Sequence, residues 1–330
     1  MEPLGDEFMT ISKLSTFEKI QPFFILAGIV IGLVLSYLPQ VSQHGGKVIL
    51  PALMLMLYNI FLQLPLQRLK AGFANLKVTG LSLTVNFILT PLIAFGMGYL
   101  FLKNSPDLWV GYFMLMLTPC TDWYLVFTGM ARGDVGLGLS LLPWNLLLQL
   151  ALLPIYLAIF AGSIVPLETM DLVRSVVFVF ILPFSLAYLT RYIVTETKGM
   201  EFLEEKGLVR ISSSQFIFLM VAIIGMFASQ GRGVLANPLI MGQLLAPVLF
   251  FFVIIYLLAQ FIGKIFKFTY PETACFTCTI AARNSPIALA IAVTAFPEQP
   301  LIALVLVIGP LIELPVLFII TKLLLKKAPA

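Results

Sequence analysis

The sequence predicts an all-α membrane protein whose ten transmembrane helices form two inverted five-helix repeats. Three observations carry this prediction: an excess of apolar residues, apolar segments of span length, and two polar interruptions at corresponding places. Of the 330 residues, 60% are hydrophobic and 11% are charged, whereas soluble domains carry roughly a quarter charged residues. The mean hydropathy is +1.03. A soluble core cannot absorb this much apolar surface, so we expect lipid to surround the helices.

A helix needs about 20 predominantly apolar residues to cross the hydrocarbon core of a bilayer. Because such segments use almost the whole chain, no soluble catalytic domain fits, and we expect neither enzyme activity nor a cofactor or metal. The net charge of +4 comes from loop lysines and arginines, which argues against a nucleic-acid partner. The expected spans are residues 20–39, 47–65, 78–102, 108–131, 134–161, 170–193, 211–230, 238–263, 272–296 and 299–321.

The basic residues set the expected orientation. Cytoplasmic loops carry an excess of lysine and arginine, and most of the 20 such residues fall on the side that holds both termini. We therefore expect both termini in the cytoplasm and the protein in the cell membrane. The acidic N-terminal residues differ from the basic start of a cleavable signal peptide, so we expect the first span to remain. The basic residues on the opposite side are Lys47, Lys103, Arg174 and Arg232.

Two expected spans contain charged residues beside a proline. The fourth span contains the segment Thr118–Asp122, and the ninth contains Arg283–Pro286. A charge at the bilayer centre costs about 2.5–3.5 kcal/mol on insertion scales, so a chain that keeps such residues is expected to bind something with them. Paired interruptions in apolar segments are typical of secondary transporters, whose half-helix ends face the substrate.

The two interruptions also divide the chain. A boundary near residue 166 gives a first repeat at 1–166 and a second at 167–330, each with five spans and a broken fourth span. The fifth span of each half has a proline followed by a polar residue, at Pro143 and Asn145 and at Pro310 and Glu313. An odd number of spans forces the second half to enter the membrane with opposite polarity. We expect the broken helices to cross, because each can then satisfy the backbone groups that the other leaves open.

These motifs resemble the bile acid–sodium symporter superfamily and, within it, the arsenite efflux permeases. The resemblance covers essentially all ten spans. It implies a panel domain and a core domain, with the crossing helices in the core and the substrate cavity between the domains. The motifs that carry it are Val85-Asn86-Phe87 with Pro91 and Leu92, Thr118-Pro119-Cys120-Thr121, Ala282-Arg283-Asn284-Ser285 with the following Ala288–Ala292, and Gly309–Pro315.

The resemblance implies a substrate role for Cys120, because arsenite permeases use a cysteine in the fourth span. Trivalent arsenic is soft and prefers thiolate sulfur, and a single thiol gives a weak, reversible contact that suits transport. The alternative is a small buried side chain that fills a helix crossing. Cys275 and Cys278 share a helix face and are less favoured as ligands. Our candidate substrate-binding residues are Cys120, Thr121, Asp122, Arg283, Asn284 and Ser285.

The sequence departs from the sodium-coupled members of this superfamily. They place an acid five residues before the ninth-span asparagine, where this chain has Thr279. Gly138 and Leu142 stand where they have small polar residues. In place of the sodium ion that those members bind, our candidate positive charge is the permanently charged guanidinium of Arg283. We hypothesise a buried pair between Asp122 and Arg283, either as a static clamp or as a pair that meets substrate or proton during transport.

Glu313 is a further acidic residue expected inside a span, where it should be protonated or paired. It is our candidate for proton coupling or gating, together with Asp122; alternatively, it hydrogen-bonds a backbone opened by Pro310 and Pro315. The sequence thus predicts a secondary active transporter that exports arsenite or a related oxyanion. The alternative is a carrier of the same fold, sodium-independent or proton-coupled, in which Arg283 binds the carboxylate of an organic anion.

Overall fold

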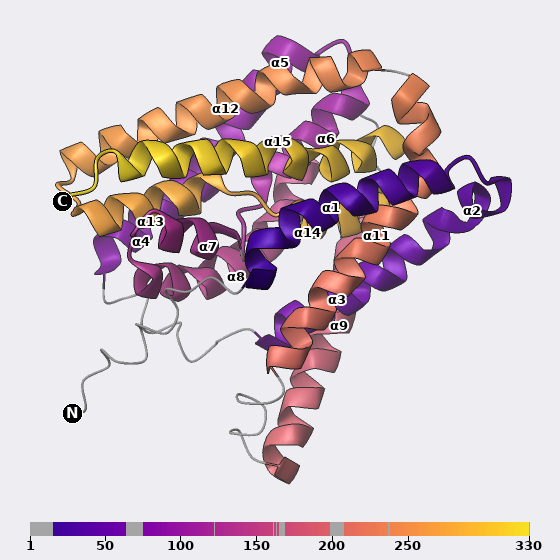
Figure 1. Ribbon diagram of the computed structural model, residues 1–330, viewed down its shortest axis with the longest axis horizontal. Helices are drawn as coiled ribbons and strands as arrows, with labels where there is room; N and C mark the ends of the chain where they lie inside the picture. Colours follow the sequence, from indigo (N-terminus) through magenta and orange to yellow (C-terminus); the bar gives the residue numbers. More distant parts are fainter. Residues whose placement is uncertain are drawn as a thin grey trace.

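A computed structural model describes residues 16–63, 75–121, 123–160, 162, 164, 169–198, 208–236 and 238–329. Within these ranges every regular element is helical, and the one β-type pairing is an isolated antiparallel bridge between Pro119 and Arg283. The predicted all-α fold is therefore confirmed for the described residues. The helices pack in two groups; in Figure 1 the steep helices α9 and α11 belong to one group and the nearly horizontal helices α12 and α15 to the other.

The first group, called here the four-helix group, consists of long helices from both halves of the chain. Helix α11 packs against α1 and α3, and α3 packs against α9. Short elements α2 (Pro39–His44) and η2 (Gly45–Val48) connect α1 to α3. The four helices are α1 (Thr16–Leu35), α3 (Ile49–Gln63), α9 (Thr169–Lys198) and α11 (Leu208–Ala236).

Polar side chains join the helices of this group. Asn59 Nδ2 of α3 donates to Ser214 Oγ of α11 at 2.9 Å, and Gln63 Nε2 donates to Gln215 Oε1 at 2.9 Å. Close backbone approach also contributes: a Cβ placed on Gly225 would lie 2.8 Å from the carbonyl oxygen of Gly45. Small residues allow such contact between membrane helices. These amides thus act as links between helices.

The second group, called here the crossing group, contains the remaining helices. Helix α15 packs against α6 and α14, while α12 packs against α5 and α13. Its helices are α4 (Leu76–Thr84), η4 (Val85–Leu89, one π-helical turn), α5 (Thr90–Leu102), α6 (Pro106–Leu117), α7 (Trp123–Met130), α8 (Val135–Ile159), α12 (Pro238–Ile265), α13 (Tyr270–Ala281), α14 (Ser285–Ala295) and α15 (Pro300–Leu325). The two groups meet where α14 packs against α3 and α9, and where α15 packs against α11.

Helix length and composition support membrane insertion. In the described ranges, seven helical stretches are long and apolar enough to cross a membrane: Pro39–Gln63, Leu76–Leu102, Val135–Ile159, Phe178–Thr197, Ser214–Gly233, Gly242–Ile265 and Pro300–Leu325. The expected fourth and ninth spans are instead pairs of short helices, α6 with α7 and α13 with α14. The chain is thus a multi-pass helical protein, with breaks at the two segments that carry charges.

Candidate functional site

Two helix breaks form the centre of the crossing group. The first separates α6, which ends at Leu117, from α7, which begins at Trp123. The second separates α13, which ends at Ala281, from α14, which begins at Ser285. Proline disfavours helical backbone in the residue before it and lacks an N–H donor. Pro119 and Pro286 therefore favour a break within an otherwise apolar, helix-forming segment.

The two breaks satisfy one another through their backbones. The Cys120 N–H donates to the Ala282 carbonyl at 3.0 Å, and the Asn284 N–H donates to the Thr118 carbonyl at 2.6 Å. The Thr118 hydroxyl adds a bond of 3.0 Å to the Asn284 carbonyl. Unpaired backbone groups cost several kcal/mol in lipid, so this pairing is what allows two open segments to lie side by side.

The Arg283 guanidinium lies at the carbonyl ends of two helices. Nη1 donates to the Met116 carbonyl of α6 at 2.9 Å, and Nε donates to the Ala281 carbonyl of α13 at 3.1 Å. Nη2 donates to the Ile280 carbonyl and, at 3.3 Å, to Asn86 Oδ1 of η4. The residue is 2% exposed. Helix C-termini carry partial negative charge and open carbonyls, so this buried cation stabilises α6 and α13 where they stop.

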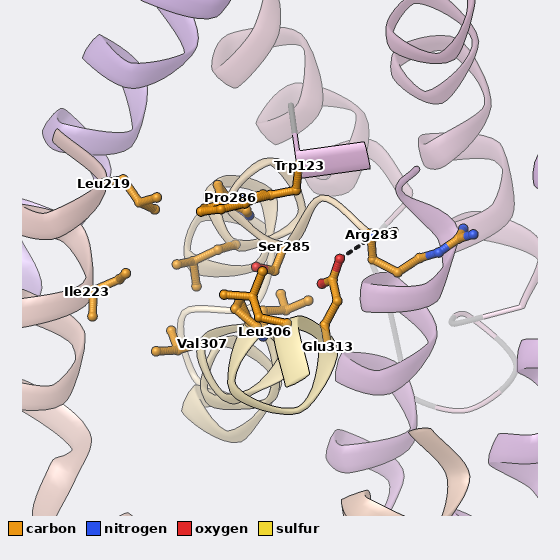
Figure 2. A pocket seen from close by; sticks show the side chains of 12 residues that line it. Trp123, Leu219, Ile223, Arg283, Ser285, Pro286, Leu306, Val307 and Glu313 are labelled. Atoms are coloured by element: carbon orange, nitrogen blue, oxygen red, sulfur yellow. Dashed lines mark hydrogen bonds between the residues drawn. The ribbon is translucent and has the colours of Figure 1, made fainter. Parts of the chain in front are cut away.

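A phenyl ring also lies against the guanidinium. The Phe251 ring centroid of α12 lies 5.3 Å from the Arg283 Cζ, a distance at which the ring face attracts a cation. Figure 2 shows the Arg283 side chain extending away from Leu219 and Ile223 of α11. In this conformation the guanidinium therefore binds helix ends instead of facing α11.

Asn284 caps the N-terminus of α14. Its Oδ1 accepts the Ile287 N–H at 3.4 Å, as an N-cap side chain does. Its Nδ2 donates to the Thr121 hydroxyl of the first break at 3.0 Å. Ser285, the first residue of α14, is 3% exposed and lines the pocket described below. Three of the predicted site residues, Thr121, Asn284 and Ser285, therefore lie together at this crossing.

Cys120 lies at the start of α7. The Trp123 N–H donates to its Sγ at 3.2 Å, so the sulfur accepts an amide at a helix N-terminus. Cys120 is 2% exposed. The Tyr124 hydroxyl on the next turn donates to the Gly138 carbonyl at 2.7 Å, which ties α7 to α8. The thiol is thus held at the crossing by the positive end of a half-helix.

Glu313 reaches the second break from α15. Its Oε1 accepts the Arg283 backbone N–H at 2.7 Å, and its side chain is 4% exposed. Arg283 immediately precedes the N-cap of α14, so the carboxylate lies at the positive end of that helix. Glu313 therefore accepts a backbone N–H of the break between α13 and α14, whereas the sequence had suggested backbone opened by Pro310 and Pro315.

A small pocket lies beside the two breaks, and residues of both helix groups line it. Leu219 and Ile223 of α11 lie on one side, and Ser285, Leu306 and Glu313 lie on the other (Figure 2). The pocket has a volume of about 40 Å³, and about 10–15 Å³ suffices to hold one water molecule. In this conformation it can hold a few waters or a small inorganic molecule.

The remaining site predictions have different outcomes. Asp122 lies outside the described residues, so its pairing with Arg283 stays a prediction. Cys275 and Cys278 are buried on α13; the Cys278 carbonyl accepts the Ala282 N–H at 3.0 Å, and Cys275 Sγ lies 3.9 Å from Thr279 Oγ1. No group of three or more His, Cys, Asp and Glu side chains among the described residues is placed to hold a metal.

Sequence reasoning missed the role of Asn86. An asparagine in a membrane helix indicates a hydrogen bond between helices, but nothing in the sequence identifies Arg283 as its partner. Its Oδ1 accepts from Arg283, and its Nδ2 donates to Asn145 Oδ1 at 3.3 Å. The apolar residues Leu219 and Ile223 of α11 line the pocket without any distinguishing feature in the sequence.

Comparison with known proteins assigns the chain to a family. It is 26% identical to the arsenical-resistance protein Acr3 of Corynebacterium glutamicum, with 93% of this chain and 88% of that protein covered. It is 25% identical to the Acr3 of Alkaliphilus metalliredigens, at 91% and 88% coverage, and 27% identical to an uncharacterised transporter of Synechocystis, at 96% and 90%. Residues 50–237, more than half of the chain, match the model of the Sodium Bile acid symporter family. The chain therefore belongs to the sodium–bile acid symporter family of membrane transporters, as its motifs predicted.

Proposed function

We propose that the chain is a secondary active transporter that exports arsenite or a related oxyanion across the cell membrane. The observation that carries the proposal is the pairing of two helix breaks beside a small buried pocket. The pocket lies between the four-helix group and the crossing group, which we propose as the panel and core domains. Sliding or rocking of one group against the other would expose the pocket to each side in turn.

The pocket favours a small substrate. A volume of about 40 Å³ accommodates a few atoms and is far smaller than the 300–1,000 Å³ typical of sites for drug-sized ligands. The organic-anion alternative requires the Arg283 guanidinium to bind a carboxylate in the pocket, but that guanidinium extends away from the pocket residues Leu219 and Ile223 (Figure 2). Two relatives that align over most of the chain are named as arsenical-resistance proteins. These points support arsenite over an organic anion.

We further propose the topology expected from the sequence: ten spans, repeats at 1–166 and 167–330, and both termini in the cytoplasm. In this scheme Cys120 supplies the soft ligand for trivalent arsenic, while Thr121, Asn284 and Ser285 provide polar contacts. Asp122 and Arg283 form the buried pair between the breaks. Glu313 exchanges the coupling proton, because protonation removes its charge from the start of α14 and weakens that contact.

Arsenite uptake into everted membrane vesicles tests the substrate. We expect accumulation against a gradient, and we expect Cys120→Ala to lower the rate at least about tenfold, which corresponds to about 1.4 kcal/mol. Cys275→Ala is the matched control, because it removes another buried thiol in the crossing group. A Cys120→Ala rate equal to that of the wild type, or uptake of organic acids in place of arsenite, would contradict the proposal.

Imposed ion gradients test the coupling. Glu313→Gln keeps the volume and an oxygen acceptor for the Arg283 N–H but removes the titratable proton. We expect a proton gradient to accelerate arsenite transport by the wild type and to have no effect on this variant. Acceleration by a sodium gradient would show that sodium is the coupling ion and would refute the proton assignment.

A further inference from the structure

Unpartnered polar atoms recur along α8 and along the stretch α4–η4–α5, part of which packs against it. Within the described ranges, seven buried side-chain nitrogen or oxygen atoms have no hydrogen-bond partner. Five of them belong to residues of α4, α5 and α8, namely Ser82 Oγ, Thr90 Oγ1, Asn145 Nδ2, Gln149 Nε2 and Gln149 Oε1. These four residues are at most 1% exposed. Buried polar groups in proteins are nearly always hydrogen-bonded, so these open groups require hydrogen-bonding partners.

These residues belong to two helix surfaces that face each other. On α8, Asn145 Oδ1 accepts from Asn86 of η4, and the Tyr156 hydroxyl donates to the Phe87 carbonyl. Gln149 lies four residues after Asn145 and seven before Tyr156, so it shares their helix face. On this face of α8, bonds to η4 are therefore made both before Gln149, at Asn145, and after it, at Tyr156.

The opposing surface is also polar. Ser82 precedes Asn86 by four residues and Thr90 follows it by four, which places all three on one side of their span. Together Ser82, Asn86, Thr90, Asn145 and Gln149 are called here the amide cluster. Asn86 joins the cluster to the transport site, because its Oδ1 accepts from Arg283 Nη2 at 3.3 Å.

The chemistry of the open groups identifies the ligand. Gln149 has both an unpartnered donor and an unpartnered acceptor, so the ligand must accept and donate hydrogen bonds. A metal cation cannot donate, and a simple anion cannot donate either. No acidic or basic side chain belongs to the amide cluster, and a cation would be repelled by Arg283. Water meets every requirement and makes two to four hydrogen bonds when buried.

We propose that the amide cluster binds ordered waters at the Gln149 and Asn145 amides, with separate waters at the hydroxyls of Ser82 and Thr90, which lie eight residues or about 12 Å apart along their span. The water at Asn145 continues the hydrogen-bond chain that runs from Arg283 through Asn86 to Asn145. It fixes the Asn86 amide in the orientation whose oxygen faces the guanidinium.

An experimental structure of the full chain in lipid nanodiscs, resolved finely enough to show water, tests the site directly. We expect water oxygens within about 2.7–3.2 Å of the Asn145 and Gln149 amides. A dry cluster in which the Gln149 amide bonds directly to Ser82, Thr90 or Asn145 would overturn the proposal. This measurement uses the wild-type chain and does not depend on the folding of any variant.

The thermal stability of Gln149→Met gives a second test, which separates an amide that binds water from one that is dry and unpartnered. If water binds the amide, the isosteric apolar side chain breaks a satisfied network and lowers Tm by several degrees. If the amide is dry and unpartnered, its removal relieves a desolvation penalty, and Tm is unchanged or rises. Leu146→Met, at a fully buried position on the same helix, is the matched control and should leave Tm within about 1 °C of the wild type.

Discussion

The two helix breaks share a backbone arrangement but differ in side-chain chemistry. Each break exchanges one N–H and one carbonyl with the other, at Cys120 and Ala282 and at Asn284 and Thr118. The first break then places a sulfur at the start of a half-helix, where it accepts the Trp123 N–H. The second break places a guanidinium at the ends of the two preceding half-helices.

This difference suggests how one helix crossing can be stable and still offer a ligand atom to a substrate. The second break holds the structure, because Arg283 satisfies the carbonyl ends of α6 and α13 while Asn284 caps α14. The first break offers a soft atom that accepts the N–H of Trp123, a residue that lines the small pocket. We infer that stability depends mainly on the second break and substrate chemistry mainly on the first. Three substitutions test this division.

The largest loss of stability is expected for Arg283→Ala. The change leaves the Met116, Ile280 and Ala281 carbonyls and the Asn86 amide without their shared donor. Each buried orphan costs about 1–3 kcal/mol, so we expect a loss of at least about 3 kcal/mol or failure to accumulate in the membrane. Thermal unfolding in detergent measures the first outcome, and membrane-fraction yield measures the second.

Arg232→Ala provides the control for this prediction. Arg232 also faces an aromatic ring, at 5.3 Å from the Tyr37 centroid, but its side chain is exposed. Its removal should change stability by less than about 1 kcal/mol. Equal effects at the two arginines would show that the helix-end contacts of Arg283 contribute little.

A moderate loss is expected for Asn284→Ala. The substitution removes the cap on Ile287 and the bond to Thr121, while the backbone pairing with Thr118 remains. Loss of an N-cap costs about 0.5–2 kcal/mol, so the variant should fold with a reduced Tm. Asn284→Asp, which retains the cap acceptor, should recover part of the difference. Full stability of the alanine variant would refute the capping role.

The smallest loss of stability is expected for Cys120→Ser. The hydroxyl can accept the Trp123 N–H in place of the sulfur, so unfolding should shift by less than about 1 kcal/mol. Arsenite transport should nevertheless fall, because the hard oxygen does not replace a soft ligand. Measured together, stability and uptake separate the two roles. A large stability loss with unchanged uptake would reverse the assignment of the two breaks.

The sequence predicted the places of the breaks because their signal is local. A proline beside polar residues within an apolar segment is visible at Thr118–Asp122 and at Arg283–Pro286 without any knowledge of packing. The acceptors of Arg283 could not be predicted, because most are backbone carbonyls, and every residue type carries one. Met116 and Ile280 have side chains that give no sign of this contact. The pocket walls on α11 were missed for the same reason, since Leu219 resembles any lipid-facing leucine.

The bond between Thr118 and Asn284 joins residues 166 positions apart, which has a consequence for biosynthesis. At about 5–20 residues per second, the ribosome needs roughly 8–33 s to make the second segment after the first. During that interval the first half-helices are in the translocation machinery or the bilayer with their interruption still open. The nascent chain must therefore be sheltered by water or by an insertase until its later partner emerges.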